Sequence, residues 1–238
     1  MRSRTLLTGF MCWLLVSGFS AAALTQALHG PAVNALRFFE ALRTRDPTAV
    51  LYALRPLPVG PDARARALAV LPATGELRPD RAERAKLAML EGVLTYHERL
   101  RVFETKVIDV PQAAVALHQR AVLLISRPAL RLLSGTEVQA MVAHEIGHDY
   151  FWTEFERTLA DRDRLRRQEL ELKCDGIALL TLVALKLDPS SLGDGLRKQM
   201  RFNQMLGADA NAADYPLLNE RQRFITALRA LAGDSPTR

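Results

Sequence analysis

The five residues His144-Glu145-Ile146-Gly147-His148 constrain this sequence more than any other segment. An i, i+4 spacing puts the imidazoles of His144 and His148 on one face of an α-helix, where both can bind one metal ion. Glu145 lies one residue along, so its carboxylate can reach a water molecule on that ion without binding the ion itself. The pentad therefore predicts a helix with two metal ligands and a basic carboxylate. The competing interpretation is a helix with two surface histidines.

A second pair of residues supplies the third ligand that such a site needs. Zinc sites of this kind use three nitrogen or carboxylate ligands and leave one position for water. Glu171 and Asp175 are also spaced i, i+4, so they share one face of a later helix. We expect Glu171 to complete the set, and Asp175 to accept a hydrogen bond from the outer nitrogen of His144. Acidic pairs are common on solvated helices, but after the pentad this one predicts one Zn²⁺ per chain.

A shared ion also requires the chain to turn back between the two motifs. One straight helix from His148 to Glu171 would separate the two residues by roughly 34 Å. No glycine or proline marks a turn between them. The most favourable place for the reversal is residues 159–163, where Asp161 or Asp163 can cap the following helix.

The rest of the chain predicts an α+β fold that is mostly helical. The composition favours helices, because leucine, alanine and arginine are frequent and aromatic residues are few. We expect a helical N-terminal region over residues 24–100, joined by proline-rich turns. A small sheet of two or three strands is expected from residues 102–110, 113–117 and 121–125. The later helices are expected at Ser134 to His148, Arg164 to Leu187, and Asn219 to Leu231.

The first 23 residues have the order of a secretory signal peptide. Two arginines precede an apolar stretch from Leu6 to Phe19, and the small residues Ser20-Ala21-Ala22-Ala23 follow. An uncleaved membrane anchor is the alternative, because about 20 apolar residues can span a bilayer. Cleavage predicts an exported protein of the bacterial periplasm, and an anchor predicts an inner-membrane protein facing the periplasm. The membrane is a partner only in the second case.

Charge and cysteine content exclude two classes of protein. The formal net charge is +6, but basic and acidic residues alternate, as in residues 156–167, which is typical of a solvated helix face. No basic stripe with aromatic residues stands out, so we expect no nucleic-acid partner. Cys174 is the only cysteine after the signal segment, which excludes an internal disulfide. We expect it to be a small buried residue rather than a reactive thiol.

Residues 142–148, followed by residues 171–176, resemble the HtpX and CAAX prenyl-protease family of gluzincins, peptidase family M forty-eight. The resemblance implies a zincin-like metallopeptidase domain over residues 101–238, in which two helices carry the HExxH and ExxxD motifs. The residues that match the family's motifs are the zinc ligands His144, His148 and Glu171, the general base Glu145, and Asp175 behind the ligands.

Two further segments are similar to parts of the same family. Residues 113–117 resemble the family's Asn-Ala-Phe-Ala segment, an edge strand that pairs with an extended polypeptide substrate. Many relatives carry His-Pro before an arginine-containing helix, and the corresponding stretch here runs from Tyr215-Pro216 to Arg221. Tyr215 either donates a hydrogen bond to the oxyanion or is an ordinary packed aromatic residue. This chain departs from many relatives in having no transmembrane pattern after its N-terminus.

Together these features predict a zinc metalloendopeptidase that hydrolyses peptide bonds of cell-envelope or exported proteins. A zinc-activated water is expected to attack the carbonyl, with Glu145 accepting its proton. The alternative is a catalytically inactive zinc-fold envelope protein that acts as a binding or chaperone-like module. The complete ligand set with Glu145 favours the enzyme.

Overall fold

The computed structural model describes residues 28–42, 46–71, 75–207 and 214–233. This part of the chain is mostly helical and contains a four-stranded sheet, so the predicted α+β class is confirmed. The predicted signal segment, residues 1–23, lies outside the described residues. Among the helices that are described, none combines the length and the apolar character needed to cross a bilayer.

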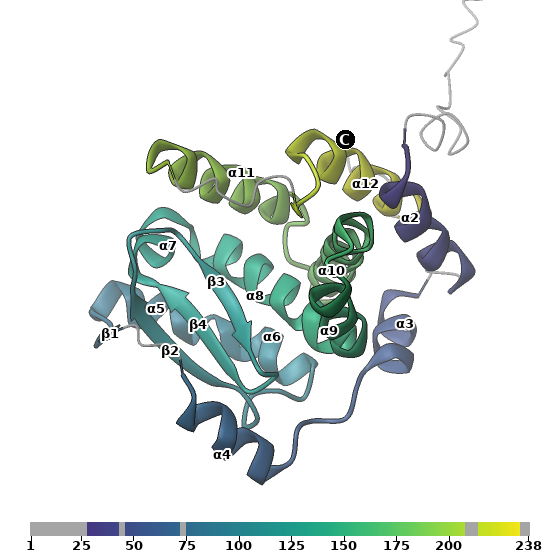
Figure 1. Ribbon diagram of the computed structural model, residues 1–238. Coiled ribbons are helices and arrows are strands. Elements are labelled where there is room, and N and C mark those ends of the chain that lie inside the picture. The colour runs from purple at the N-terminus through teal and green to yellow at the C-terminus, as the bar shows by residue number, and fades with distance from the viewer. Residues whose placement is uncertain (1–27, 43–45, 72–74, 208–213, 234–238) are drawn as a thin grey trace, which may run out of the picture.

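The elements follow one another along the chain as Figure 1 shows. The helices are α2 (Pro31–Ala41), α3 (Pro47–Leu54), α4 (Pro61–Ala69), α5 (Arg81–Ala88), α6 (Leu90–Tyr96), α7 (Arg127–Leu132), α8 (Gly135–Tyr150), α9 (Trp152–Asp161), α10 (Arg164–Ala184), α11 (Ser190–Met205) and α12 (Leu218–Leu231). The strands are β1 (Gly75–Glu76), β2 (Glu104–Asp109), β3 (Val115–His118) and β4 (Val122–Ser126).

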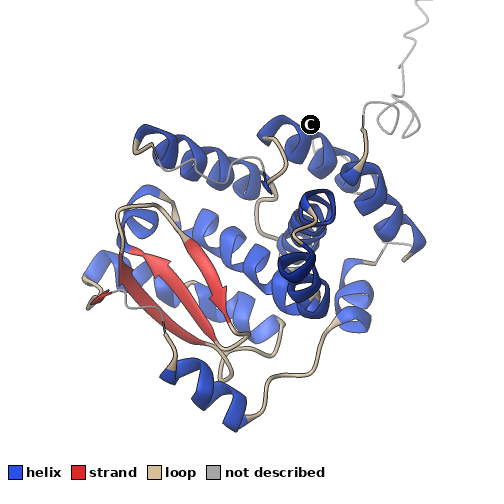
Figure 2. Cartoon of the chain, viewed as in Figure 1, coloured by secondary structure: helices blue, strands red, loops and turns tan. Residues whose placement is uncertain are grey.

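The strand order β1-β2-β4-β3 makes β3 an edge strand of the sheet (Figure 2). The central strand β4 is buried along its whole length and pairs parallel with β2 and antiparallel with β3. We predicted two or three strands, and the fourth is β1, which adds two residues antiparallel to β2. A strand this short carries no alternating pattern, so its sequence reads as a turn-rich connection.

Helices α8 and α10, which carry the two sequence motifs, pack against each other (Figure 1). α8 begins with a capping box, in which Ser134 and Glu137 each bond to the backbone N–H of the other. At the contact, a Cβ atom on Gly147 would lie only 2.6 Å from Cα of Cys174. Glycine is therefore required there, although it costs about 1 kcal/mol of helix propensity relative to alanine.

The chain reversal between the two motifs occurs where we predicted it. α8 ends at Tyr150, and α9 follows and ends at Asp161. Arg162 then adopts the left-handed conformation, with φ 53°, and the side chain of Asp163 caps α10 by accepting from Arg166 N–H. A non-glycine residue thus makes the turn, which explains why the sequence signals it only through its aspartates.

Helices from both ends of the chain cover α10. α2, α3 and α12 all pack on it, and α2 also packs against α12 (Figure 1). The side chains of Asp46 and Asp80 cap α3 and α5 by accepting from the backbone N–H groups of Ala49 and Glu83. α11 was not predicted, because its first half contains two glycines and has low helix propensity. Its buried face, which includes Leu192 and Leu196, packs on α8 and stabilises the helix instead.

Candidate metal centre

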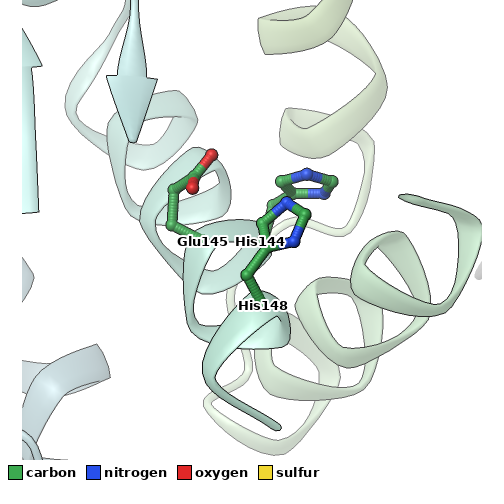
Figure 3. Close-up of side chains that lie close together, drawn as sticks. All are labelled: His144, Glu145 and His148. Carbon is green, nitrogen blue, oxygen red and sulfur yellow. The ribbon is translucent and has the colours of Figure 1, made fainter. Parts of the chain in front are cut away.

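The pentad lies on α8 with its three functional side chains together. Figure 3 shows the rings of His144 and His148 next to each other, with the carboxylate of Glu145 beside them. One ligand atom from each of the three residues lies within 4.8 Å of the others. All three side chains are buried, at 4%, 8% and 9% exposure for His144, His148 and Glu145. The predicted surface-histidine alternative is therefore wrong, and the group could hold a metal ion.

The structure brings Glu171 from α10 to the same point. His144 Nε2 lies 3.3 Å from Glu171 Oε2, and His148 Nε2 lies 3.6 Å from Glu171 Oε1. In a tetrahedral zinc site with bonds of about 2.0–2.1 Å, neighbouring ligand atoms lie about 3.3–3.4 Å apart. Each histidine nitrogen thus lies at about this distance from one oxygen of Glu171, and two nitrogens with a carboxylate are a donor set that fits zinc.

The outer nitrogens of both histidines are held by neighbouring side chains. His144 Nδ1 lies 2.9 Å from Asp175 Oδ1, the contact predicted for Asp175. His148 Nδ1 lies 3.5 Å from the sulfur of Cys174, which is buried as predicted. Since Nδ1 is engaged on the outside of each ring, Nε2 is the atom left to face Glu171.

Arg221 on α12 is a residue of the centre that we did not predict. Its Nε donates to Asp175 Oδ2 at 2.7 Å and its Nη2 to Asp175 Oδ1 at 2.6 Å, and the guanidinium is buried. The same Nη2 lies 3.4 Å from His144 Nδ1. The sequence shows an arginine in the C-terminal helix, but it does not show that this arginine binds Asp175, because the contact depends on packing between distant helices.

The pKa values show how these charges compensate one another. Burial lowers the pKa of His144, but hydrogen bonds to Asp175 and Glu171 outweigh burial and raise it to about 10. For His148, burial dominates and lowers the pKa to about 4. Burial raises the pKa of Glu171, but the two histidines outweigh it and bring the value to about 2. The centre therefore holds Glu171 as an anion that needs a bound cation, either a proton on His144 or a metal ion.

Glu145 faces the sheet rather than Glu171. Its Oε2 accepts a hydrogen bond from the backbone N–H of Leu117 on β3 at 3.0 Å. Burial raises the pKa of Glu145 to about 7, and the charge of Glu171 contributes in the same direction. A carboxylate with this pKa can exchange a proton near neutral pH.

Tyr215 lies at the margin of the centre. The residue is 43% exposed, and its backbone oxygen accepts a hydrogen bond from Gln168 on α10 at 3.5 Å. Burial of the phenol raises its pKa, followed by the charge of Glu171. In the described part of the chain no hydrogen bond fixes the Tyr215 hydroxyl, so its role as an oxyanion donor stays a prediction.

Two surface clefts lie away from this centre. The larger, of about 640 Å³, lies between Val110, Pro111, Arg127, Arg131 and Phe202. The smaller, of about 320 Å³, lies around the end of α8 and the start of α9. None of His144, Glu145, His148 and Glu171 lines either cleft.

Comparison with family models and with curated proteins gives no identification. A scan against models of protein families finds no match for the chain. A search of the curated proteins finds no match either.

Proposed function

We propose that this protein is a zinc-dependent endopeptidase. The observation that carries the proposal is the convergence of His144 Nε2 and His148 Nε2 on the carboxylate of Glu171, with the carboxylate of Glu145 beside the two histidines. Two nitrogens and one carboxylate are the protein ligands of hydrolytic zinc sites in peptidases. The centre lies on two packed helices, which supports the zincin-like fold and the gluzincin resemblance as parts of the proposal.

His144, His148 and Glu171 would hold the metal. When bound, zinc supplies a Lewis acid that polarises a peptide carbonyl and acidifies water. Arg221 and Asp175 hold the ring of His144 in place, and this network would orient its Nε2 to bind the metal. Mg²⁺ and Ca²⁺ prefer oxygen ligands, so the nitrogen-rich set favours zinc over them.

Glu145 is the proposed general base. Burial raises the pKa of its carboxylate above that of an exposed glutamate, which suits a group that accepts a proton from the attacking water and passes it to the leaving amine. The backbone of β3 reaches this carboxylate through Leu117. An extended polypeptide that pairs with the outer edge of β3 would therefore present its peptide bonds beside Glu145.

The proposed substrates are cell-envelope or exported proteins. The support is the signal-like order of residues 1–23, so we propose a periplasmic protein, or one anchored in the inner membrane if that segment stays attached. Nucleic acid is not among the proposed partners.

The test is metal analysis of the purified protein together with hydrolysis of casein. We expect about one zinc per chain in the wild type and in Glu145→Gln, and hydrolysis by the wild type alone. Undiminished hydrolysis by Glu145→Gln would refute the role of Glu145. A wild type that binds zinc but cuts no polypeptide would refute the peptidase.

One observation favours a second candidate, a catalytically inactive zinc-fold envelope protein that binds other proteins. The four central side chains, Glu171 at 5% exposure included, are nearly closed to solvent, and Glu145 is already bonded to Leu117. A structural zinc site is closed in this way. Zinc retention without hydrolysis in the same experiment would support this candidate.

A further inference from the structure

The backbone of β3 shows which of its residues face the open edge of the sheet. Ala114 faces β4, because its carbonyl accepts a hydrogen bond from Ser126 N–H at 2.8 Å. Backbone groups alternate in direction along an antiparallel strand. Ala113, Val115 and Leu117 therefore direct their N–H and C=O groups away from β4, towards the outer edge.

The outer edge is closed at Ala113 by the side chain of Asn203. The Oδ1 atom of Asn203 accepts from Ala113 N–H at 2.9 Å, and its Nδ2 donates to the carbonyl of Ala113 at 3.0 Å. Directly opposed residues of antiparallel strands exchange the same two hydrogen bonds. The carboxamide thus occupies the place that the next strand would take.

Nearer to Glu145, the described residues place no carboxamide against the edge, and Val115 is 6% exposed. Leu117 donates its N–H to that carboxylate, and in the described part of the chain no hydrogen bond from another element reaches the outward backbone groups of Val115. Sheet edges are often covered to prevent pairing with other chains. Here Asn203 pairs with both backbone groups of Ala113, whereas the outward groups of Val115 and the carbonyl of Leu117 have no such partner in the described part of the chain. Protection of the whole edge would not stop at one residue.

α11 does not need this contact for its own anchoring. Leu192 and Leu196 are buried against the core, and Leu196 lies two helical turns before Asn203. A Cβ atom on Gly195 would lie 3.5 Å from side-chain atoms of Glu137 and Met141, so α11 lies close to α8 there. The apolar face therefore fixes the helix, and Asn203 extends from its far end to the strand.

We propose that Asn203 is a specificity-determining residue that limits the length of the substrate strand bound by β3. The peptide pairs with the outward groups of Val115 and with the carbonyl of Leu117, whose N–H is bonded to Glu145, and its pairing ends where Asn203 already occupies Ala113. Four residues of extended chain, about 13 Å, separate Leu117 from that stop. This inference rests on the proposed function, since it places the scissile bond beside Glu145.

A stop at this distance selects a class of substrate. Towards Ala113, a bound polypeptide must either end or turn away from β3 within about four residues of the scissile bond. Chain termini and exposed loops meet this condition, whereas long extended segments do not. The favoured substrates are therefore short extended stretches of otherwise folded proteins or the ends of chains.

Peptide binding to the zinc-loaded Glu145→Gln protein tests the inference without turnover. The probes are end-blocked peptides in which valine and threonine alternate. The shortest has four residues, and the others are longer by two residues at a time at one end or at the other. Calorimetry gives the Kd of each peptide for this protein and for the same protein with Asn203→Ala. Gln204→Ala is the matched control, because it removes an exposed carboxamide from the next position of α11.

With Asn203 present, we expect extension at one end to stop improving the Kd after about four residues. In Asn203→Ala, two more residues at that end should lower the Kd by roughly fivefold, the size of one net hydrogen bond. Asn203→Asp cannot donate to the Ala113 carbonyl and should release the limit too, while Gln204→Ala should keep it.

An unchanged length limit in both Asn203 variants, or no binding of any peptide, would overturn the inference. The proposed function fails in a different way, through absence of casein hydrolysis by the wild type. If the protein binds peptides with an Asn203-dependent length limit but hydrolyses none, the inference about Asn203 stands and the proposed peptidase activity is refuted.

Discussion

The guanidinium of Arg221 on α12 binds both carboxylate oxygens of Asp175 on α10, and both side chains are buried. The pKa of Asp175 is lowered despite burial, because Arg221 and His144 favour the charged form. The C-terminal helix is thereby linked to the orientation of a proposed zinc ligand.

Replacing Arg221 by Gln should destabilise the protein by about 3–5 kcal/mol, since it leaves a buried carboxylate without its cation. Zinc affinity should fall about 10–100-fold, as is typical when a partner of a metal-binding histidine is lost. Urea unfolding and zinc titration measure the two effects. Arg201→Gln, at an exposed position of α11, is the control and should change neither. Wild-type zinc affinity in Arg221→Gln would contradict the positioning role.

Glu171→Gln should weaken zinc binding by more than about 100-fold, because it removes a ligand charge rather than a supporting contact. The side chain keeps its size, so the chelator-treated variant should unfold within about 1–2 kcal/mol of the chelator-treated wild type. Competition with a fluorescent chelator gives the affinity. A variant that retains zinc as the wild type does would show that Glu171 is not a ligand.

The site residues that follow helix periodicity could be predicted from the sequence. His144 with His148, and Glu171 with Asp175, meet because i, i+4 spacing fixes a shared face whatever the rest of the fold does. The reversal at Arg162 was harder, since a left-handed non-glycine residue has no sequence signature, and only the Asp163 cap indicated it.

The residues that depend on long-range packing could not be predicted. Arg221 reaches Asp175 only because α12 packs on α10, and Asn203 reaches Ala113 only because α11 packs across α8. α11 itself has weak helix propensity, so its existence depends on the surface that receives it. Contacts of this kind leave no local pattern in one sequence.

His97 should make stability depend on pH. Its ring is fully buried between Tyr150 and Thr181, and burial, followed by the charges of Arg55 and Arg99, lowers its pKa to about 3. Below pH 6.5 the unfolded chain binds a proton that the folded protein excludes. Stability is therefore complete above about pH 7 and falls as the pH decreases towards 3, by about 1.4 kcal/mol per unit.

Urea unfolding of the chelator-treated protein at pH 7.5 and pH 5.0 measures this effect. His97 should account for about 2 kcal/mol of the difference between the two values. His97→Gln should lose that part, and His29→Gln, at an exposed position, should retain it. Equal pH dependence in the wild type and His97→Gln would show that His97 does not carry it.

Two glycine substitutions separate helix propensity from the close approach of α8 and α10. Gly147→Ala places its Cβ atom 2.6 Å from Cα of Cys174, and this backbone atom cannot move without shifting α10. We expect a loss of about 1–3 kcal/mol despite the better helix former. Gly193→Ala in α11 has no atom within 4 Å of its new Cβ and should be neutral or more stable by up to about 1 kcal/mol.

The same pair of variants tests whether helix spacing sets the metal centre. A shift of α10 carries Glu171 away from His144 and His148, so Gly147→Ala should also lose zinc affinity, and Gly193→Ala should not. Chemical denaturation and zinc titration of both proteins give the comparison. Loss of stability with unchanged zinc affinity in Gly147→Ala would mean that the ligands tolerate movement between the two helices.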